Sequence, residues 1–377
     1  MKRPLACLVI LLIGAFSTLA QEHTYHVYVA SEAADRITAV RFGPAGAVAD
    51  HELTTGIMPV DIDGPHGLAI SRDKKYYYVS IAHGQPFGSL WKYSAGDDKV
   101  LGRVTLGMFP ATLDLSPDGD FAYVVNFNLH GDMVPSSVSV VATEDMTEIT
   151  RIQTCAMPHG SRLNASGSRH YSACMMDEQL VEIDTATLKV SRHFVLTKGS
   201  EAGMPGPPMR MSNNQSQTAM PGHGTEPPKP GDTSCSPTWA QPSRTRSSVF
   251  VACNGSSEIV EIDTQTWKLM RRIPAGPGVY NLGITKDETK LIATNRRDQS
   301  VSVFDVAAGK ELARLPTKRK VVHGVAIAPD DRYAFISVEG IAADPGTVEV
   351  IDLRTLRTVA TVDVPPQAGG IDFWKME

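Results

Sequence analysis

The sequence predicts an all-β fold, a seven-bladed β-propeller of four-stranded antiparallel blades. Six units of similar pattern follow one another, each with a short apolar strand, a polar turn and further strands. Their starts are 42 to 48 residues apart, except for one interval of 79 residues. A strand-rich repeat of this length is typical of a propeller blade.

We number these units as blades 1 to 6 in chain order. Within each unit, apolar and polar residues alternate, or Val, Ile and Tyr predominate, whereas Asp, Gly, Pro and Asn fill the connections. Strands and hairpins require this pattern. The same repeated position opens each first strand, and its occupants are His66, Ala111, His159, Thr238, Tyr280 and His323.

A seventh blade is expected from the two ends of the chain. The segment His26–Arg41 supplies later strands without a first one, and Gly369–Trp374 supplies a first strand without later ones. Pairing the two ends closes the ring and covers strand edges that would otherwise promote aggregation. Residues 21–377 are therefore expected to form one domain, and we expect a monomer.

The N-terminus has the layout of a secretory signal peptide over residues 1–20. Lys2 and Arg3 precede an apolar run at Leu5–Ile13, which is too short to span a bilayer, and small residues precede Gln21. We expect a periplasmic or secreted protein with no integral membrane segment after cleavage. The cleavage changes the formal net charge from -5 to -7, which disfavours nucleic-acid binding because phosphate contacts require basic surface.

The repeat elements resemble those of the YVTN-type family of seven-bladed propellers. The resemblance rests on the turn Ser116–Gly119 with the strand Tyr123–Asn126, and on Val181–Thr187, and its pattern covers the mature chain. It implies an architecture like that of lactonase-like and haem-d1-domain-like propellers in exported proteins. It implies no single function, because such propellers include binding proteins and enzymes.

Histidines gather on one face of the predicted ring. In a propeller blade the first strand is innermost and the second runs back beside it, so the start of the first and the loop after the second share the top face. His66, His159 and His323 should therefore surround the top of the channel, where we expect them to bind a transition metal, most favourably copper. Six of the eleven histidines precede a glycine and map to this face: His66, His83, His130, His159, His223 and His323.

An insertion between blades 3 and 4, residues 198–233, is expected to be a flexible loop rich in Met, Pro and Gly. Thioether and imidazole ligands suit copper, Cu(I) above all, so its side chains could assist binding. Equally, the channel histidines could pack the channel wall, and the methionines could contact a partner protein. The auxiliary ligands expected from the insertion and from blade 3 are Met209, Met211, His223, Met175 and Met176.

Four cysteines remain after loss of Cys7, in two pairs with similar spacing. The pair Cys155 and Cys174 is 19 residues apart, and the pair Cys235 and Cys253 is 18 residues apart. In each pair the first precedes a first strand and the second ends a second strand, so two intrablade disulfides are expected in an oxidising compartment. Thiolate metal ligation and pairing across blades 3 and 4 remain open alternatives.

No catalytic residue is assigned. The sequence has no Cys-x-x-Cys-His for covalent haem, no Gly-x-Ser-x-Gly elbow and no phosphate-binding glycine loop. Asp184 and Asp263 belong to a repeated Ile-Asp-Thr element and are expected to cap turns.

The favoured function is an exported propeller that binds copper at the top of its channel. One alternative is a non-catalytic scaffold for an exported protein or peptide partner, with capture depending on residues 203–224. Another is a lactonase-like hydrolase or lyase that uses a channel histidine with Arg296 and Glu339. This last alternative requires a substrate-sized pocket in which a channel histidine and Glu339 lie within hydrogen-bond reach.

Overall fold

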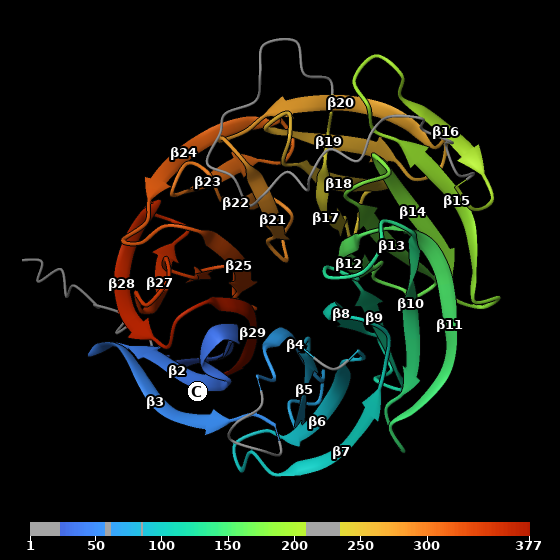
Figure 1. Ribbon diagram of the computed structural model, residues 1–377. Coiled ribbons are helices and arrows are strands. Elements are labelled where there is room, and N and C mark those ends of the chain that lie inside the picture. Colours follow the sequence, from blue (N-terminus) through green and yellow to red (C-terminus); the bar gives the residue numbers. More distant parts are fainter. Residues whose placement is uncertain (1–22, 57–61, 84–85, 209–233) are drawn as a thin grey trace, which may run out of the picture.

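Seven antiparallel sheets are arranged in a ring around a central axis (Figure 1). The computed structural model describes residues 23–56, 62–83, 86–208 and 234–377. The predicted signal peptide, residues 1–20, lies outside the described residues, as does the part of the insertion from 209 to 233. The predicted seven-bladed propeller is therefore confirmed.

Blades 1 to 6 run outward from the axis in chain order, and their strands have the following bounds. Blade 1 contains β4 (Pro65–Ile70), β5 (Tyr76–Ile81), β6 (Ser89–Ser94) and β7 (Val100–Thr105). Blade 2 contains β8 (Pro110–Leu115), β9 (Phe121–Asn126), β10 (Pro135–Ala142) and β11 (Thr147–Ala156). Blade 3 contains β12 (Pro158–Leu163), β13 (Arg169–Cys174), β14 (Gln179–Asp184), β15 (Lys189–Val195) and β16 (Ala202–Pro205). Blade 4 contains β17 (Pro237–Pro242), β18 (Ser248–Cys253), β19 (Glu258–Asp263) and β20 (Lys268–Pro274).

The remaining three blades complete the ring. Blade 5 contains β21 (Val279–Ile284), β22 (Lys290–Asn295), β23 (Ser300–Asp305) and β24 (Lys310–Pro316). Blade 6 contains β25 (Val322–Ile327), β26 (Tyr333–Val338), β27 (Gly346–Asp352) and β28 (Arg357–Val364). Blade 7 contains β29 (Ala368–Met376), β1 (Tyr25–Ser31), β2 (Arg36–Gly43) and β3 (Gly46–Thr54), with the short 3₁₀ helix η1 (Glu32–Ala34) between β1 and β2.

Blade 7 closes the ring as predicted. The C-terminal strand β29 pairs antiparallel with β1, with Val27 opposite Phe373 and Val29 opposite Ile371. Tyr25 and Phe373 lie in one apolar cluster with Phe335 of blade 6, so the closing strand also contributes to the packing between blades.

The repeated sequence position has the same place in every blade. It is the second residue of the innermost strand, one residue inside the strand rather than ahead of it. All seven occupants therefore lie at equivalent heights around the axis: His66, Ala111, His159, Thr238, Tyr280, His323 and Gly369.

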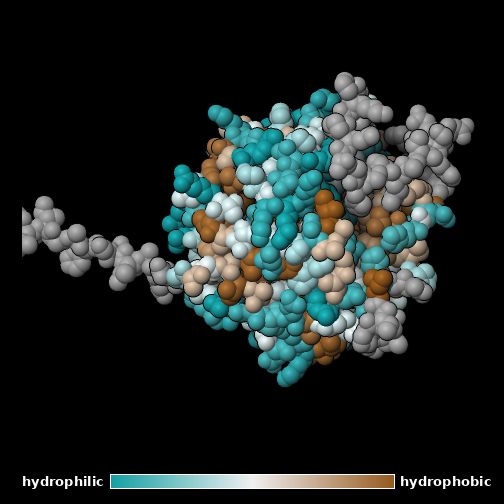
Figure 2. Space-filling view, turned by 60° about the vertical axis from the view of Figure 1, so that its left-hand side comes forward, coloured by the Kyte–Doolittle hydropathy of each residue, from teal (hydrophilic) through white to brown (hydrophobic). Residues whose placement is uncertain are grey.

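Most of the surface in view in Figure 2 is hydrophilic, with separate hydrophobic patches between the polar groups. The aliphatic and aromatic side chains concentrate instead between neighbouring blades. Across the four described segments, no helix has the length and apolar character needed to cross a membrane.

The insertion begins with regular structure. The strand β16 pairs with the outer edge of β15, with Met204 opposite His193. A Cβ on Gly203 would lie 2.3 Å from the backbone oxygen of Trp267, so glycine permits this close approach to blade 4. Here the prediction of a flexible loop is wrong for four residues, because they satisfy their backbone hydrogen bonds on the free edge of blade 3.

Both expected disulfides are present, Cys155–Cys174 and Cys235–Cys253. Cys155 lies near the end of β11, so the first bond joins blades 2 and 3. The intrablade prediction is wrong for this bond because the outer strand of blade 2 extends through Cys155. It is correct for the second bond, and with all four sulfurs in these bonds neither thiolate ligation nor pairing across blades 3 and 4 occurs.

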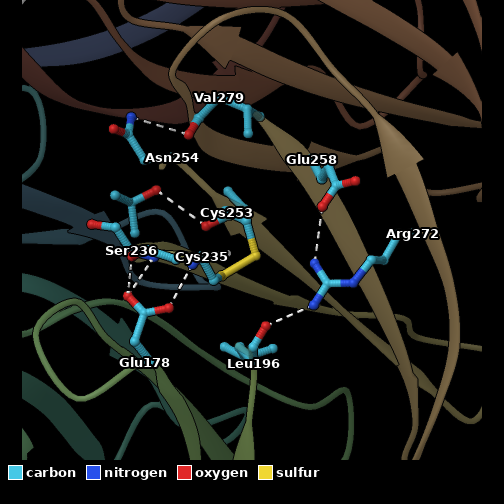
Figure 3. Close-up of a disulfide and its surroundings, with 12 residues drawn as sticks. Glu178, Leu196, Cys235, Ser236, Cys253, Asn254, Glu258, Arg272 and Val279 are labelled. Atoms are coloured by element: carbon cyan, nitrogen blue, oxygen red, sulfur yellow. Dashed lines mark hydrogen bonds and ion pairs between the residues drawn. A yellow bond between two sulfur atoms is a disulfide. The ribbon is translucent and has the colours of Figure 1, made fainter. Parts of the chain in front are cut away.

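The second disulfide is also tied to blade 3. Glu178 accepts hydrogen bonds from the backbone N–H of Cys235 at 2.5 Å and of Ser236 at 2.8 Å (Figure 3). The chain that returns from the insertion is thereby fixed at the start of blade 4.

The capping role of the repeated aspartates is confirmed. Asp184 accepts backbone N–H bonds from Ala186 and Thr187 at 3.1 and 2.9 Å. Asp263 makes the equivalent bonds in blade 4. These carboxylates stabilise hairpin turns, and no catalytic role is needed to explain them.

The buried His170 in β13 predicts how the stability of the fold changes as the pH falls. It is fully buried and stacks on Tyr123, with 5.3 Å between ring centres. Burial, with a smaller effect of the Arg162 charge, lowers its pKa from 6.5 to about 3. The folded protein keeps this ring neutral, whereas the unfolded chain protonates it below its ordinary pKa, so stability is lost as the pH falls from 6.5 towards 3.

We expect His170 to reduce the free energy of unfolding by about 2 kcal/mol between pH 6.5 and pH 5. His170→Phe keeps an aromatic ring against Tyr123 but cannot titrate. Urea unfolding at both pH values should show that the variant loses about 2 kcal/mol less than the parent. Equal losses in the two proteins would contradict this assignment.

Candidate functional site

Three histidines lie around the top of the channel at the repeated position, and the structure brings their rings close together. The ring centres of His66 and His159 are 6.0 Å apart, and those of His66 and His323 are 5.6 Å apart. His159 and His323 are buried, with 1% and 3% of their surface exposed. Blades 1, 3 and 6 therefore bring imidazoles together across a channel that is narrow at this level.

His66 is oriented by a carboxylate from blade 7. Its Nδ1 is 2.6 Å from Oε2 of Glu32, whose Oε1 is 2.8 Å from Nε2 of His83. An ionised carboxylate only accepts, so Nδ1 of His66 carries a proton, and in the neutral ring Nε2 has the lone pair. That Nε2 is buried and has no hydrogen-bond partner among the described residues.

The charges around Glu32 are balanced within this group. Burial raises the pKa of Glu32, but the charges and hydrogen bonds of His66 and His83 outweigh burial and place its pKa below the ordinary value. The hydrogen bond to Glu32 raises the pKa of His83 against the opposing effect of burial. Glu32 is therefore an anion that links two imidazoles.

His159 has a different environment. Its Nδ1 is 3.1 Å from the carbonyl oxygen of Thr238, and its Nε2 is 3.1 Å from the hydroxyl of Tyr280. Because a carbonyl only accepts, Nδ1 donates and Nε2 accepts from the hydroxyl. Burial raises the pKa of Tyr280, which keeps that hydroxyl protonated. Both nitrogens of His159 are thus engaged within the protein.

His323 lies beside a buried ion pair. Arg296 and Glu339 interact in a bidentate manner at 2.9 and 3.2 Å, and the guanidinium lies over the ring of Tyr280 at 4.8 Å. Nε2 of His323 is 3.9 Å from Glu339, and its Nδ1 is buried without a hydrogen-bond partner among the described residues. Burial, and then the Arg296 charge, lower the pKa of His323 well below 6.5, whereas burial raises the pKa of Glu339.

A small cavity adjoins His66 and His323, the channel imidazoles with a buried nitrogen that has no hydrogen-bond partner among the described residues. Its volume is about 20 Å³, and both His66 and His323 line it. This is room for about one water molecule or one ion, and not for a sugar-sized ligand. Gly369 contributes to the space, because a Cβ there would lie 3.7 Å from Nδ1 of His323.

The two described methionines that were predicted as ligands, Met175 and Met176, are not among these rings. Met175 packs against the apolar cluster that contains Phe109 and Phe127, and Met176 is 37% exposed. Within the described part of the chain, no group of three or more His, Cys, Asp and Glu side chains has an arrangement that could hold a metal ion. Met209, Met211 and His223 lie outside the described residues.

The sequence analysis missed Glu32. His83 and Glu339 lie on the top face because each follows the second strand of its blade. β1 is the second strand of blade 7, and Glu32 follows it directly. The division of this blade between the two chain ends hides the equivalence, which the repeat alignment could otherwise have revealed.

No protein-family model matches the sequence, and no curated protein matches it. Solved structures do resemble its fold. A periplasmic gluconolactonase of Pseudomonas aeruginosa superposes with a TM-score of 0.69 at 15% identity, over 93% of this chain and 99% of that one. A putative 6-phosphogluconolactonase from Bacteroides uniformis gives 0.66 at 13%, over 93% and 99%.

Hydrazine synthase of Kuenenia stuttgartiensis has a TM-score of 0.61 at 20% identity, over 84% of this chain and 91% of that one. At these identities the similarity establishes the propeller fold alone. The chain therefore has lactonase-like structural neighbours without a demonstrated shared activity.

Proposed function

We propose that this chain is an exported propeller that binds one Cu(I) ion between His66 and His323. The observation that carries the proposal is the pair of buried imidazole nitrogens, Nε2 of His66 and Nδ1 of His323. Neither has a hydrogen-bond partner among the described residues, and both residues line the same cavity of about 20 Å³. A buried polar atom normally has a partner, so these two nitrogens are available to a shared ion or a water molecule.

The spacing of the rings fits one shared ion. With metal–nitrogen bonds near 2 Å, the ligating nitrogens of one ion lie roughly 3 to 4 Å apart, and two imidazoles that face the ion in a bent arrangement have ring centres roughly 5 to 6 Å apart. The ring centres of His66 and His323 are 5.6 Å apart. The hydrogen bond from His66 to Glu32 is the kind of carboxylate contact that orients histidine ligands in metal sites.

The ligand set favours copper over harder metals. Ca²⁺ and Mg²⁺ require several oxygen ligands, and structural Zn²⁺ sites take four ligands. Two imidazole nitrogens in a tight cavity suit Cu(I), which accepts two-coordinate geometry. Soft thioether ligands from the insertion, Met209 and Met211, would strengthen that preference, with His223 and Met176 as further candidates. Because His159 uses both nitrogens, we assign it to positioning Tyr280.

Export is part of the proposal. Two disulfides support an oxidising compartment, and the signal-peptide pattern supports the periplasm or the exterior. The name of the Pseudomonas aeruginosa neighbour includes the same compartment. The repeat elements also support placing the chain among YVTN-type propellers.

One substitution at three equivalent positions tests the proposal. His66→Phe, His159→Phe and His323→Phe each keep a ring and remove both nitrogens. In anaerobic Cu(I) titration against a chromophoric chelator, we expect one equivalent in the parent and a loss of affinity of about 100-fold or more in the first and third variants. His159→Phe should retain binding within about tenfold. Equal Cu(I) binding by all four folded proteins would contradict the proposed site.

A hydrolase remains a second candidate, because Glu339 lies 3.9 Å from His323. This separation exceeds direct hydrogen-bond reach and would need a bridging water for proton transfer, whereas the lactonase names of two structural neighbours support the candidate. The cavity of about 20 Å³ is small for such a substrate. Hydrolysis of a sugar lactone that is lost in Glu339→Gln, in a protein that binds no Cu(I), would replace the copper proposal.

The scaffold alternative depends on residues 203–224, most of which lie outside the described residues. It stays a proposal for that segment and does not involve the two unpaired imidazole nitrogens.

A further inference from the structure

A row of imidazoles leads from the surface to the proposed copper site. His130, in the loop after β9, is exposed, and 30% of the His83 side chain is exposed. Exposure then falls to 11% at His66 and 4% at His323. The ring centres of His130 and His83 are 5.7 Å apart, and Glu32 bridges His83 to His66.

One phenyl ring forms the common wall of this row. The ring centre of Phe109 is 5.1 Å from that of His83, 5.5 Å from that of His130 and 5.5 Å from that of His66. Phe109 is buried, and its backbone has a φ of 50°, an uncommon conformation for a residue with a side chain. An aromatic face attracts a cation, so this wall suits the passage of a positive ion.

His83 and His66 each place one ring nitrogen against Glu32 and leave the other nitrogen for an ion. Nε2 of His83 is used by Glu32, which leaves Nδ1 as the atom that can bind an ion. The anionic Glu32 lies between His83 and the inner site, where it favours the transfer of a cation inward. The steps are ligand exchanges between imidazole nitrogens, in which any proton on Nδ1 of His83 leaves to solvent as the ion binds, and they require no change in the oxidation state of the ion.

We propose that His130 and His83 form a capture and transfer path that delivers Cu(I) to His66 and His323. This inference rests on the proposed function, because the path serves that site. The outer residues determine how fast the ion arrives, whereas the inner pair determines how tightly it is bound.

Stopped-flow transfer of Cu(I) from a chromophoric chelator to the full chain tests the path. His130→Gln removes the outer imidazole, and His83→Gln retains an amide donor for Glu32. We expect the double variant to accept Cu(I) at least about tenfold more slowly, with an equilibrium affinity within about threefold of the parent. His51→Gln, an exposed histidine on β3 that is paired with Asp98, is the control and should change neither quantity.

The outcomes separate the two proposals. An unchanged transfer rate in the folded double variant overturns the path while the copper site stands. An affinity loss as large as that of His66→Phe also overturns it, because the outer histidines would then be ligands and not a path. Absence of Cu(I) binding in the parent protein overturns the proposed function itself.

Discussion

Truncation after Gln367 should prevent formation of the closed ring. It removes β29, the innermost strand of blade 7, and with it every backbone pair between β29 and β1. The edge of β1 and the apolar side chains of Tyr25 and Phe335 would then face water. Because an open apolar edge promotes association, we expect aggregation in size-exclusion chromatography and loss of the cooperative thermal transition.

A point substitution in β29 tests the importance of the closing strand in a protein that still folds. Phe373 is 6% exposed and packs against Tyr25 and Phe335, so Phe373→Ala should cost about 3 to 5 kcal/mol in urea unfolding. Val359→Ala is the control on the outer strand β28, where the side chain is 48% exposed, and should cost no more than about 0.5 kcal/mol. Similar costs for the two variants would contradict the importance of the closing strand.

Arg296→Met should destabilise the protein by about 3 to 5 kcal/mol, because it leaves the carboxylate of Glu339 buried without its partner. The pair is bidentate, and its side chains are 14% and 12% exposed. The variant also loses the guanidinium over the ring of Tyr280. Urea unfolding at neutral pH measures the loss.

The double variant Arg296→Met, Glu339→Leu should recover most of that stability, because no unpaired charge remains. Arg314→Met provides the matched surface control. Arg314 and Glu311 also form a bidentate pair, but their side chains are 36% and 28% exposed. Its loss should cost about 1 kcal/mol or less. A similar cost at both sites would mean that Arg296 does not compensate a buried charge.

The histidines could be predicted as a group, but their roles could not. The repeat places His66, His159 and His323 at one level of the channel, but only the structure shows that their rings lie close together. Their hydrogen-bond partners make the rings different. Glu32 leaves one nitrogen of His66 available, whereas Thr238 and Tyr280 occupy both nitrogens of His159. Those partners come from other blades, at sequence distances where no local pattern relates them.

The disulfides were also predicted in part from the sequence and decided in part by the tertiary structure. The spacing of the cysteines predicts both pairs, because equivalent positions in successive blades impose similar separations. The extension of β11 through Cys155 determines that the first bond joins two blades, since strand ends depend on pairing between strands more than on local sequence.

The sequence by itself determined the number of blades, the closure by the two chain ends and the height of each channel residue. It could do so because the strand pattern repeats along the chain, and within each strand the alternation of side chains sets locally which way they point. The tertiary structure alone decided which imidazole nitrogens are paired, how large the cavity between them is, and that Glu32 bridges His66 and His83. These features depend on distances between blades of a few ångströms, which only the closed ring sets.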